Sequence, residues 1–483
     1  MSEKTSLKKN IALNMIYKLL IIIIPFVTSP YLSRMLGPEA SGTYAYINSL
    51  VSYFVLFAAL GINGYGTRLI ARCKSNDIDV RQNFWSLFII QVFTFGVSIL
   101  LFYLYVIIFK SSDILYLLFI FTILGGLLDV TWLFQGLENF GRVVLRNSLI
   151  KIVSLILIFI FVKSPDDLWE YILIVSGSTC ISQLIMWPYI FRHIKWARFD
   201  SLILKKHIKP ILILFIPTFA ISIFNTMDKI MLGQFVSVEK VGFYDYSEKI
   251  IAVPKNLIAA LGHAMLPRVS FMVAEGKDDE AKKYLSYTYY FVFIFCYLIA
   301  FGLAASGECF AVLYWGQDYI ECGKILALLA PAFVFICVGN VIRTQYLIPN
   351  MMDKEYVISI CLGALVNFVG NLIVIRYWGV IGACITTIMA EFTVMAVQFF
   401  FVRKKVSIFK DFIYSIPFLL IGVLMYIVIT LINNNYAHSI HKFLIMVSVG
   451  GAIYLMLTSI IILLSKNNNA IWLKQKVLRR IKK

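Results

Sequence analysis

The residues most able to do chemistry lie in 242–267, a stretch that is otherwise apolar and long enough to cross a bilayer. Its five ionisable side chains are Asp245, Glu248, Lys249, Lys255 and His263. At helical spacing four of them share one face, and Lys249 lies at the edge of that face. Because a charged side chain in hydrocarbon is costly, this face is expected to line protein or a water-filled cavity. Its lysines could bind an anion, and its acids could pair with them or exchange a cation.

The same stretch has a counterpart about 200 positions upstream. The matching residues are Gly42, Tyr44, Tyr46, Gly61 and Arg68 for Gly242, Tyr244, Tyr246, Gly262 and Arg268. The positions that correspond to the charged face in this upstream copy carry polar or small, uncharged residues. They are Ala45, Asn48, Ser52, Val55, Ala59 and Asn63. A Leu-Gly pair before each copy, at Leu36 and Leu232, is expected to end a preceding helix. The pattern predicts a parallel repeat.

Candidates for binding an anionic substrate are the lysines of the charged face and the polar residues of the helices around it. They are Asn14, Lys18, Asn48, Ser52, Asn225, Lys249 and Lys255. For Lys18 two interpretations stay open, because a lysine two turns inside a helix can project into a cavity or extend to the headgroups.

Acids inside apolar helices are candidates for coupling or gating, since they are usually paired or functional. They are Asp129, Asp228, Asp245, Glu248 and Glu391. Each has a structural alternative. Asp228 could merely neutralise Lys229, and Glu248 could merely pair with Lys249 or Lys255.

The composition places these residues in a polytopic all-α membrane protein. Hydrophobic residues make up 60% of the 483 and charged residues only 14%, well below the roughly 25% of soluble domains. Taking about 20 apolar residues as one crossing predicts fourteen helices. Their ranges are 11–33, 42–62, 84–108, 114–135, 143–162, 169–191, 211–234, 242–264, 284–305, 324–346, 356–375, 379–401, 411–432 and 441–464.

The repeat divides these helices into two lobes of six, and helices thirteen and fourteen have no counterpart in it. The expected domains are 1–195, a basic linker 196–209, 210–405, and 406–483 with the last two helices and a basic tail. Most of the 44 Lys and Arg residues fall on the N-terminal side of the predicted membrane. The positive-inside rule therefore predicts that both termini are cytoplasmic. It also explains the net charge of +18 without a nucleic-acid partner.

Enzyme chemistry and metal binding have little support in the sequence. The eight cysteines lie mostly inside predicted helices without CxxC spacing, which indicates packing residues rather than a metal site or a disulfide framework. Ser/His and His/Asp constellations, P-loops and metal-ligand spacings are not found. We therefore expect neither catalysis nor a cofactor.

Four segments resemble the polysaccharide-transport (Wzx-like) branch of the multidrug/oligosaccharidyl-lipid/polysaccharide exporter superfamily. They are LSRMLGPEASGTY (32–44), GINGYGTRLIAR (61–72), WLFQGLE (132–138) and MDKIMLGQFVSVEKVGFY (227–244). The resemblance implies the fold of multidrug exporters and lipid II flippases, with two six-helix lobes around a cationic cavity, two extra helices and alternating access. By position, Lys18, Lys249 and Lys255 match cations that hold a diphosphate in related lipid II flippases, whereas Asn48 and Ser49 stand where those proteins have Arg.

The function implied is flipping of undecaprenyl-diphosphate-linked oligosaccharide units across a bacterial cytoplasmic membrane, for capsule, exopolysaccharide or O-antigen assembly. A proton or sodium ion is the candidate coupling ion. A polysaccharide polymerase and glycosyltransferases are candidate partners, besides membrane lipids. The alternatives are a flippase for teichoic-acid units or lipid II, a multidrug/cation antiporter, and a membrane scaffold that transports nothing. A scaffold has no reason to bury charges, and the lysines argue against a cation exporter.

Overall fold

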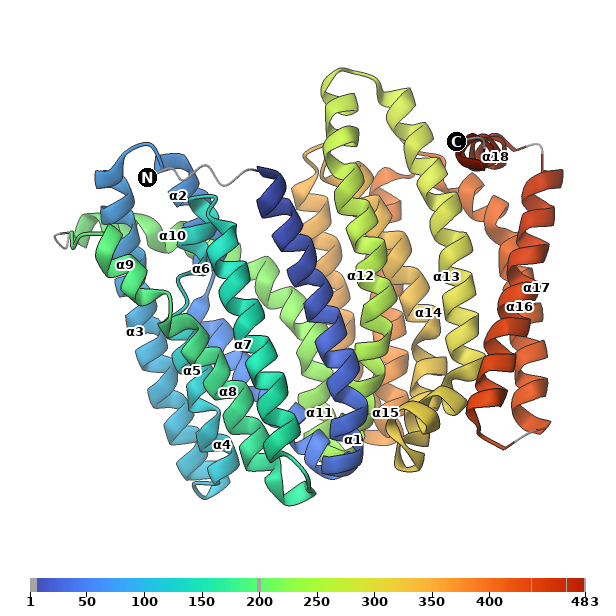
Figure 1. Cartoon of the computed structure of the whole chain (residues 1–483). Helices are drawn as coiled ribbons and strands as arrows, with labels where there is room; N and C mark the ends of the chain where they lie inside the picture. The colour runs from blue at the N-terminus through green and yellow to red at the C-terminus, as the bar shows by residue number, and fades with distance from the viewer. Residues whose placement is uncertain (1–6, 198–200, 436, 466, 482–483) are drawn as a thin grey trace. The chain divides into compact units, whose positions relative to one another are not determined.

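The computed structural model describes residues 7–197, 201–435, 437–465 and 467–481, and within these ranges it describes side chains from Ile23 to Gln475 except at 140, 142, 193, 201–203, 434–435 and 468. Throughout these ranges the regular structure is helical, so the all-α prediction is confirmed for the described residues. The chain forms two compact units, Met1–Ser222 and Ile223–Lys483 (Figure 1). The finer domain limits at 196–209 and 406 stay predictions.

The first unit is a set of packed helices. In chain order they are α1 (Leu7–Ala59), α2 (Ile62–Cys73), α3 (Asp77–Lys110), α4 (Ile114–Leu118), α5 (Ile120–Leu127), α6 (Thr131–Gly136), α7 (Phe140–Phe161), η1 (Pro165–Asp167), α8 (Leu168–Leu184), α9 (Trp187–His193) and α10 (Ser201–Ser222). Helix α1 packs on α3 and α7, and α8 packs on α5 and α7.

The second unit contains the charged helix, α12. Its elements are η2 (Ile223–Met227), α11 (Asp228–Phe235), α12 (Val238–Ala274), α13 (Asp278–Trp315), η3 (Gln317–Tyr319), α14 (Ile320–Ile342), η4 (Arg343–Leu347), α15 (Asp353–Val402), α16 (Ile408–Asn435), α17 (Ile440–Leu464) and α18 (Asn468–Ile481). Helix α14 packs on α12, α13 and α15, and α11 packs on both α12 and α15. Charged and polar residues of α11, α12 and α15 are thereby brought together.

Twelve helical segments among the described residues are long and apolar enough to cross a membrane. Two of them, of 51 and 50 residues, would be about 75 Å long if straight, against about 30 Å of hydrocarbon. Each is interrupted by a glycine with positive φ, Gly37 in α1 (φ 73°) and Gly379 in α15 (φ 53°), a conformation that other residues rarely adopt. The predicted number of fourteen crossings stays a prediction.

The break before the second repeat copy lies later than the sequence indicated. The first Leu-Gly pair ends at Gly37, where the helix is interrupted as expected. The second was expected to end a helix at Gly233, but α11 continues to Phe235. The chain turns instead at Val236 and Ser237, where the Ser237 hydroxyl caps α12 by accepting a hydrogen bond from the Lys240 amide.

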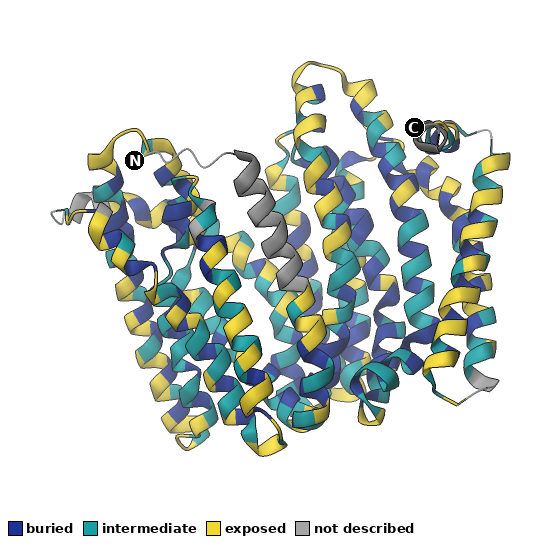
Figure 2. Cartoon of the chain, in the orientation of Figure 1, coloured by how far each residue is buried: buried dark blue, intermediate teal, exposed yellow. Residues whose placement is uncertain are grey.

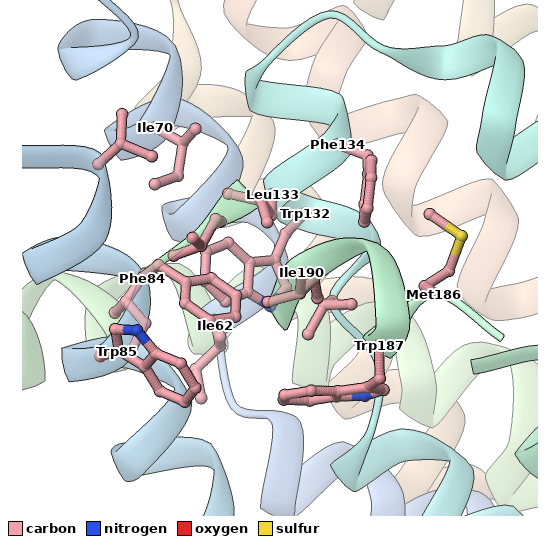
Figure 3. Close-up of a cluster of buried hydrophobic side chains, with 14 of the residues drawn as sticks. Ile62, Ile70, Phe84, Trp85, Trp132, Leu133, Phe134, Met186, Trp187 and Ile190 are labelled. Atoms are coloured by element: carbon pink, nitrogen blue, oxygen red, sulfur yellow. The ribbon is translucent and has the colours of Figure 1, made fainter. Parts of the chain in front are cut away.

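A buried hydrophobic cluster joins α2, α3, α6 and α9 in the first unit (Figure 3). Two segments that carry the family resemblance, 61–72 and 132–138, meet here. A Cβ on Gly66 would lie 2.7 Å from the Trp132 ring, and one on Gly136 would lie 2.6 Å from Ile70 Cβ, so both glycines permit a close helix crossing. The Thr67 hydroxyl donates to Gln135 Oε1 at 3.2 Å. These segments therefore form one packed structural element.

Residues 64–83 lie between the predicted crossings 42–62 and 84–108, and most of them are helical. Helix α2 runs to Cys73, and α3 begins at Asp77 after a short turn capped by Asn76. A helix with apolar residues on one face and arginines on the other can lie along a membrane interface. Arg68 and Arg72 are both on this helix.

Figure 2 shows exposed residues along the long helices, and many of the exposed residues are large and apolar. On α3, for example, Phe93, Ile108 and Phe109 are each about two thirds exposed or more. A soluble domain would bury such residues, whereas a membrane protein presents them to lipid. This surface agrees with the membrane class that the composition predicted.

Candidate functional site

The site begins at η2, a π-helical turn that leads directly into α11. A π-helical turn holds one more residue than an α-helical turn, so it changes the direction in which the following side chains point, and it is frequent at functional sites. Asp228 and Lys229 come next, on the helix that packs against both α12 and α15. Although adjacent, they have entirely different partners.

Lys229 belongs to an ionic cluster with the first turns of the charged face. Its ammonium lies 2.7 Å from an Asp245 carboxylate oxygen and 3.0 Å from one of Glu248. Asp245 also binds Lys249 at 2.6 Å across one helical turn. We call Lys229, Asp245, Glu248 and Lys249 the lysine cluster. Its two positive and two negative charges balance, which is how buried charges are normally accommodated.

Exposure differs within the lysine cluster. The side chains of Lys229 and Asp245 are 15% and 12% exposed, whereas that of Lys249 is 47% exposed. The Lys249 ammonium also lies 5.1 Å from the centre of the Tyr246 ring, in cation–π contact. Lys249 is therefore the cluster's accessible cation, but a carboxylate already holds it.

Asp228 is surrounded by neutral donors instead. It is 2% exposed. The Tyr244 hydroxyl donates to its Oδ2 at 2.8 Å and the Thr387 hydroxyl to the same oxygen at 3.0 Å, while the Asn371 amide donates to its other oxygen. We call Asp228, Tyr244, Asn371 and Thr387 the Asp228 network. It joins α11, α12 and α15 and contains no basic residue.

These contacts decide two alternatives that the sequence left open. Asp228 does not neutralise Lys229, because the ammonium of Lys229 binds the acids of α12 and Asp228 binds hydroxyls and an amide. Glu248 does not pair with Lys249 or Lys255; its salt bridge is to Lys229. Closeness in sequence did not predict these ion pairs, because the side chains of adjacent residues on a helix point about 100° apart.

A second layer of polar side chains continues from Asp228 along α15. Asn371 Nδ2 lies 3.2 Å from Asn367 Oδ1, and the Thr386 hydroxyl donates to Asn371. Both asparagines are fully buried. The Asn367 amide nitrogen has no hydrogen-bond partner among the described residues. A buried polar atom of this kind normally holds water or another ligand.

Two further candidates of the second unit stand apart from these contacts. Lys255 on α12 and Glu391 on α15 are partly exposed, and neither makes a hydrogen bond or salt bridge within the described part of the chain, although their opposite charges are close enough to interact. Lys255 thus has no carboxylate in direct contact. Asn225, on η2, is exposed.

The candidates of the first unit are placed differently. Asn48 is exposed, and the Ser52 hydroxyl donates to the Ser49 carbonyl of its own helix at 2.7 Å. Asp129 lies in the turn before α6, where its carboxylate accepts a hydrogen bond from the Thr131 amide at 2.9 Å. Asn14 and Lys18 lie in the part of α1 whose side chains are outside the described residues.

Sequence reasoning missed Tyr244 and Thr387 as partners of Asp228. Tyr244 appeared only as a marker of the repeat, and a threonine in an apolar helix carries no distinctive signal. Asn367 and Asn371 do carry a signal in the sequence: they are polar residues in an apolar helix, and a separation of four residues places them on the same helix face. Over the described residues, no group of three or more His, Cys, Asp or Glu side chains could hold a metal ion.

This arrangement, many apolar helices with charged and amide side chains clustered inside a unit, defines a multi-pass membrane transporter. Residues 7–273 match the family described as "Polysaccharide biosynthesis protein", which is more than half of the chain. The protein belongs to this family, within the multidrug/oligosaccharidyl-lipid/polysaccharide exporter superfamily. The family resemblance seen in the sequence is confirmed.

Two relatives carry the name "Putative O-antigen transporter". The one from Shigella dysenteriae is 27% identical over 390 residues, covering 80% of this chain and 97% of the relative. The one from Escherichia coli strain K12 is 23% identical over 413 residues, covering 84% and 98%. The similarity therefore extends over nearly the full length of both relatives.

Solved structures support the fold. The lipid II flippase MurJ in an inward closed conformation aligns with a TM-score of 0.72 at 18% identity, covering 93% of this chain and 98% of that one. An inward-facing multidrug resistance transporter of the MATE family aligns with a TM-score of 0.61 at 15% identity, covering 81% and 99%. At these identities the similarity shows a shared fold only.

Proposed function

We propose that this protein flips an undecaprenyl-diphosphate-linked oligosaccharide unit from the cytoplasmic to the outer leaflet by alternating access, and is not an enzyme. The relatives named as O-antigen transporters and the fold shared with a lipid II flippase support this proposal. O-antigen, capsule and exopolysaccharide units carry the same lipid diphosphate, so one cation site would serve any of them. Fourteen crossings, with α1 and α15 each crossing twice, and cytoplasmic termini complete the proposed topology.

The observation that carries the proposal is the cationic part of α12. Lys255 has no bound carboxylate, and Lys249 is half exposed. A diphosphate would bind Lys255 directly and compete with Asp245 for Lys249. An ammonium acts as a point charge that adapts to a phosphate group. Lys18, Asn14, Asn48, Ser52 and Asn225 are the remaining proposed contacts of the substrate. An antiporter for organic cations would have little use for such lysines.

The test is flipping of a lipid diphosphate glycan in proteoliposomes by the wild-type protein and four variants. Lys255→Gln and Lys249→Gln should both reduce flipping, and Lys255→Arg should keep part of it. Lys354→Gln, a change of the same type at an exposed position at the start of α15, is the matched control and should leave flipping unchanged. Wild-type flipping by both Gln variants, at wild-type levels of folded protein, would reject the diphosphate site.

We further propose that Asp228 exchanges a cation, a proton or a sodium ion, during transport. A carboxylate with three neutral donors and no basic partner retains a negative charge that a cation can neutralise. The Asp228 carboxylate and the hydroxyls of Tyr244 and Thr387 beside it are hard oxygen ligands of the kind that suits sodium. Glu391, which also has no ion pair, is a second candidate, whereas Asp129, Asp245 and Glu248 have structural partners.

A further inference from the structure

A cavity lined by charged, polar and apolar side chains lies in the second unit. None of its lining residues belongs to the lysine cluster or the Asp228 network. Its volume is about 620 Å³, within the usual range for small-ligand sites. Residues of four helices line it: Glu308 on α13, Glu321 and Lys324 on α14, Ile381 on α15, and Thr430 and Asn433 on α16. These positions adjoin the turn from α13 to α14, the interruption at Gly379 and the end of α16. The cavity therefore lies near the ends of helices, which in the proposed topology is the level of the lipid headgroups.

Close packing of α13 and α14 determines where Glu308 lies relative to the beginning of α14. A Cβ on Gly323 would lie 2.4 Å from Glu308 Cα, and one on Gly307 would lie 2.8 Å from the Gly323 carbonyl oxygen. Only glycines permit this approach. It places the beginning of α14, with Glu321 and Lys324, directly beside Glu308. The geometry of these charged residues is thus set by the backbone.

Two of the side chains that line the cavity have polar atoms without hydrogen-bond partners in the described part of the chain. Asn433 Oδ1 and Thr430 Oγ1 are buried and have no hydrogen-bond partner among the described residues. Glu308 likewise makes no hydrogen bond or ion pair in that part of the chain. Glu321 differs, because Lys240 already binds it at 2.6 Å. Buried acceptors without partners are unfavourable, so a ligand with donors would stabilise this region.

The charges define the ligand further. Glu308 is an anion that favours a cationic donor, and Lys324 on the exposed side of the cavity is a cation without an ion pair among the described residues. A ligand with a primary ammonium and a phosphate meets both requirements. The apolar rim, where Ile381 is 53% and Tyr426 38% exposed, suits acyl chains.

We propose that this cavity binds the headgroup of a zwitterionic aminophospholipid, with its ammonium at Glu308, Thr430 and Asn433 and its phosphate at Lys324. A choline headgroup carries the same charge but has no N–H donors, so it leaves the acceptors unpaired. A glycerol headgroup has hydroxyl donors but no cation, so it leaves the negative charge of Glu308 without a counterion. The bound lipid joins α13, α14 and α16 at the end of the unit. By the positive-inside prediction this end faces the outer leaflet.

Lipid retention by the full-length protein tests the proposal. The protein in detergent is mixed with equal amounts of phosphatidylethanolamine, phosphatidylcholine and phosphatidylglycerol of identical acyl chains, and bound lipids are counted by native mass spectrometry. Phosphatidylethanolamine should be retained in preference to the other two. Glu308→Gln should weaken its binding by about tenfold, as expected for loss of a hydrogen bond to a charged group. Thr430→Val should weaken it less.

The matched control is Glu275→Gln, the same substitution at an acid that pairs with Lys277 outside the cavity. It should retain phosphatidylethanolamine like the wild type. Equal retention of the ethanolamine and choline lipids, or unchanged retention by folded Glu308→Gln protein, would overturn the proposal. Preferential retention of phosphatidylglycerol would also overturn it, because that headgroup has no amine.

Discussion

The lysine cluster and the Asp228 network contain adjacent residues of α11 and of α12, but they stabilise buried charge in different ways. In the lysine cluster every charge has an opposite charge within 3.0 Å. In the Asp228 network one carboxylate is held by hydroxyls and an amide, without a cation. A balanced cluster can release a lysine only when an anion replaces the carboxylate. An unbalanced carboxylate, in contrast, can accept a cation without breaking a salt bridge.

The largest effect is expected when the balance of the lysine cluster is broken. Lys229→Gln leaves Asp245 with only the half-exposed Lys249 and leaves Glu248 without its salt bridge. Removing one partner of a buried ion pair typically costs about 3 to 5 kcal/mol. We expect the thermal unfolding midpoint in detergent to fall clearly. A midpoint equal to that of Lys354→Gln protein would show that the cluster does not stabilise the unit.

The next largest effect is expected at Asp228. Comparing Asp228→Ala with Asp228→Asn separates the loss of the side chain from the loss of its charge. Asp228→Ala leaves Tyr244, Asn371 and Thr387 without their acceptor, which should cost about 1 to 3 kcal/mol for a buried unsatisfied group. Asp228→Asn keeps the shape, and the two hydroxyls can rotate to accept hydrogen bonds from its amide. Unfolding midpoints should therefore rank wild type near Asp228→Asn, with Asp228→Ala lower. The reverse ranking of the two variants would contradict the network described above.

Lys249→Gln should destabilise the protein much less than Lys229→Gln, because the Lys249 side chain is 47% exposed. Exposed ion pairs are typically worth at most about 1 kcal/mol. Its main expected effect is on flipping. Thermal unfolding and proteoliposome flipping measured on the same preparations would separate these effects. A large loss of stability with normal flipping would assign Lys249 a purely structural role.

The smallest effect is expected in the uncharged repeat copy. Ser52 bonds only to its own helix among the described residues, and a hydroxyl of this kind contributes little. Ser52→Ala should change neither the unfolding midpoint nor the flipping rate measurably. A flipping defect in folded Ser52→Ala protein would show that the first copy contributes directly to the substrate site.

The sequence predicted what depends on composition and periodicity. The membrane class, the helices, the interruption at Gly37 and the charged face of α12 all follow from apolar runs, a Leu-Gly signal and helical spacing. Partners across helices could not be predicted in this way. The π-helical turn η2 directs Asp228 and Lys229 to different neighbours, and the partners Asn371 and Thr387 are more than 140 residues away in sequence. The helical nature of 62–73 was missed because its short amphipathic pattern lies between longer apolar runs.

The central claim, that an anionic lipid-linked glycan is flipped with cation exchange at Asp228, is tested most directly in proteoliposomes. Flipping would be measured with the membrane potential, the pH gradient and the sodium gradient imposed separately, for wild type, Asp228→Asn and Glu391→Gln. An inside-negative potential alone favours outward movement of negative charge, by about 2.3 kcal/mol per charge per 100 mV. We predict that one ion gradient accelerates wild-type flipping and that Asp228→Asn abolishes this acceleration while keeping the response to potential. Flipping that responds to potential alone, and equally in wild type and both variants, would contradict the account.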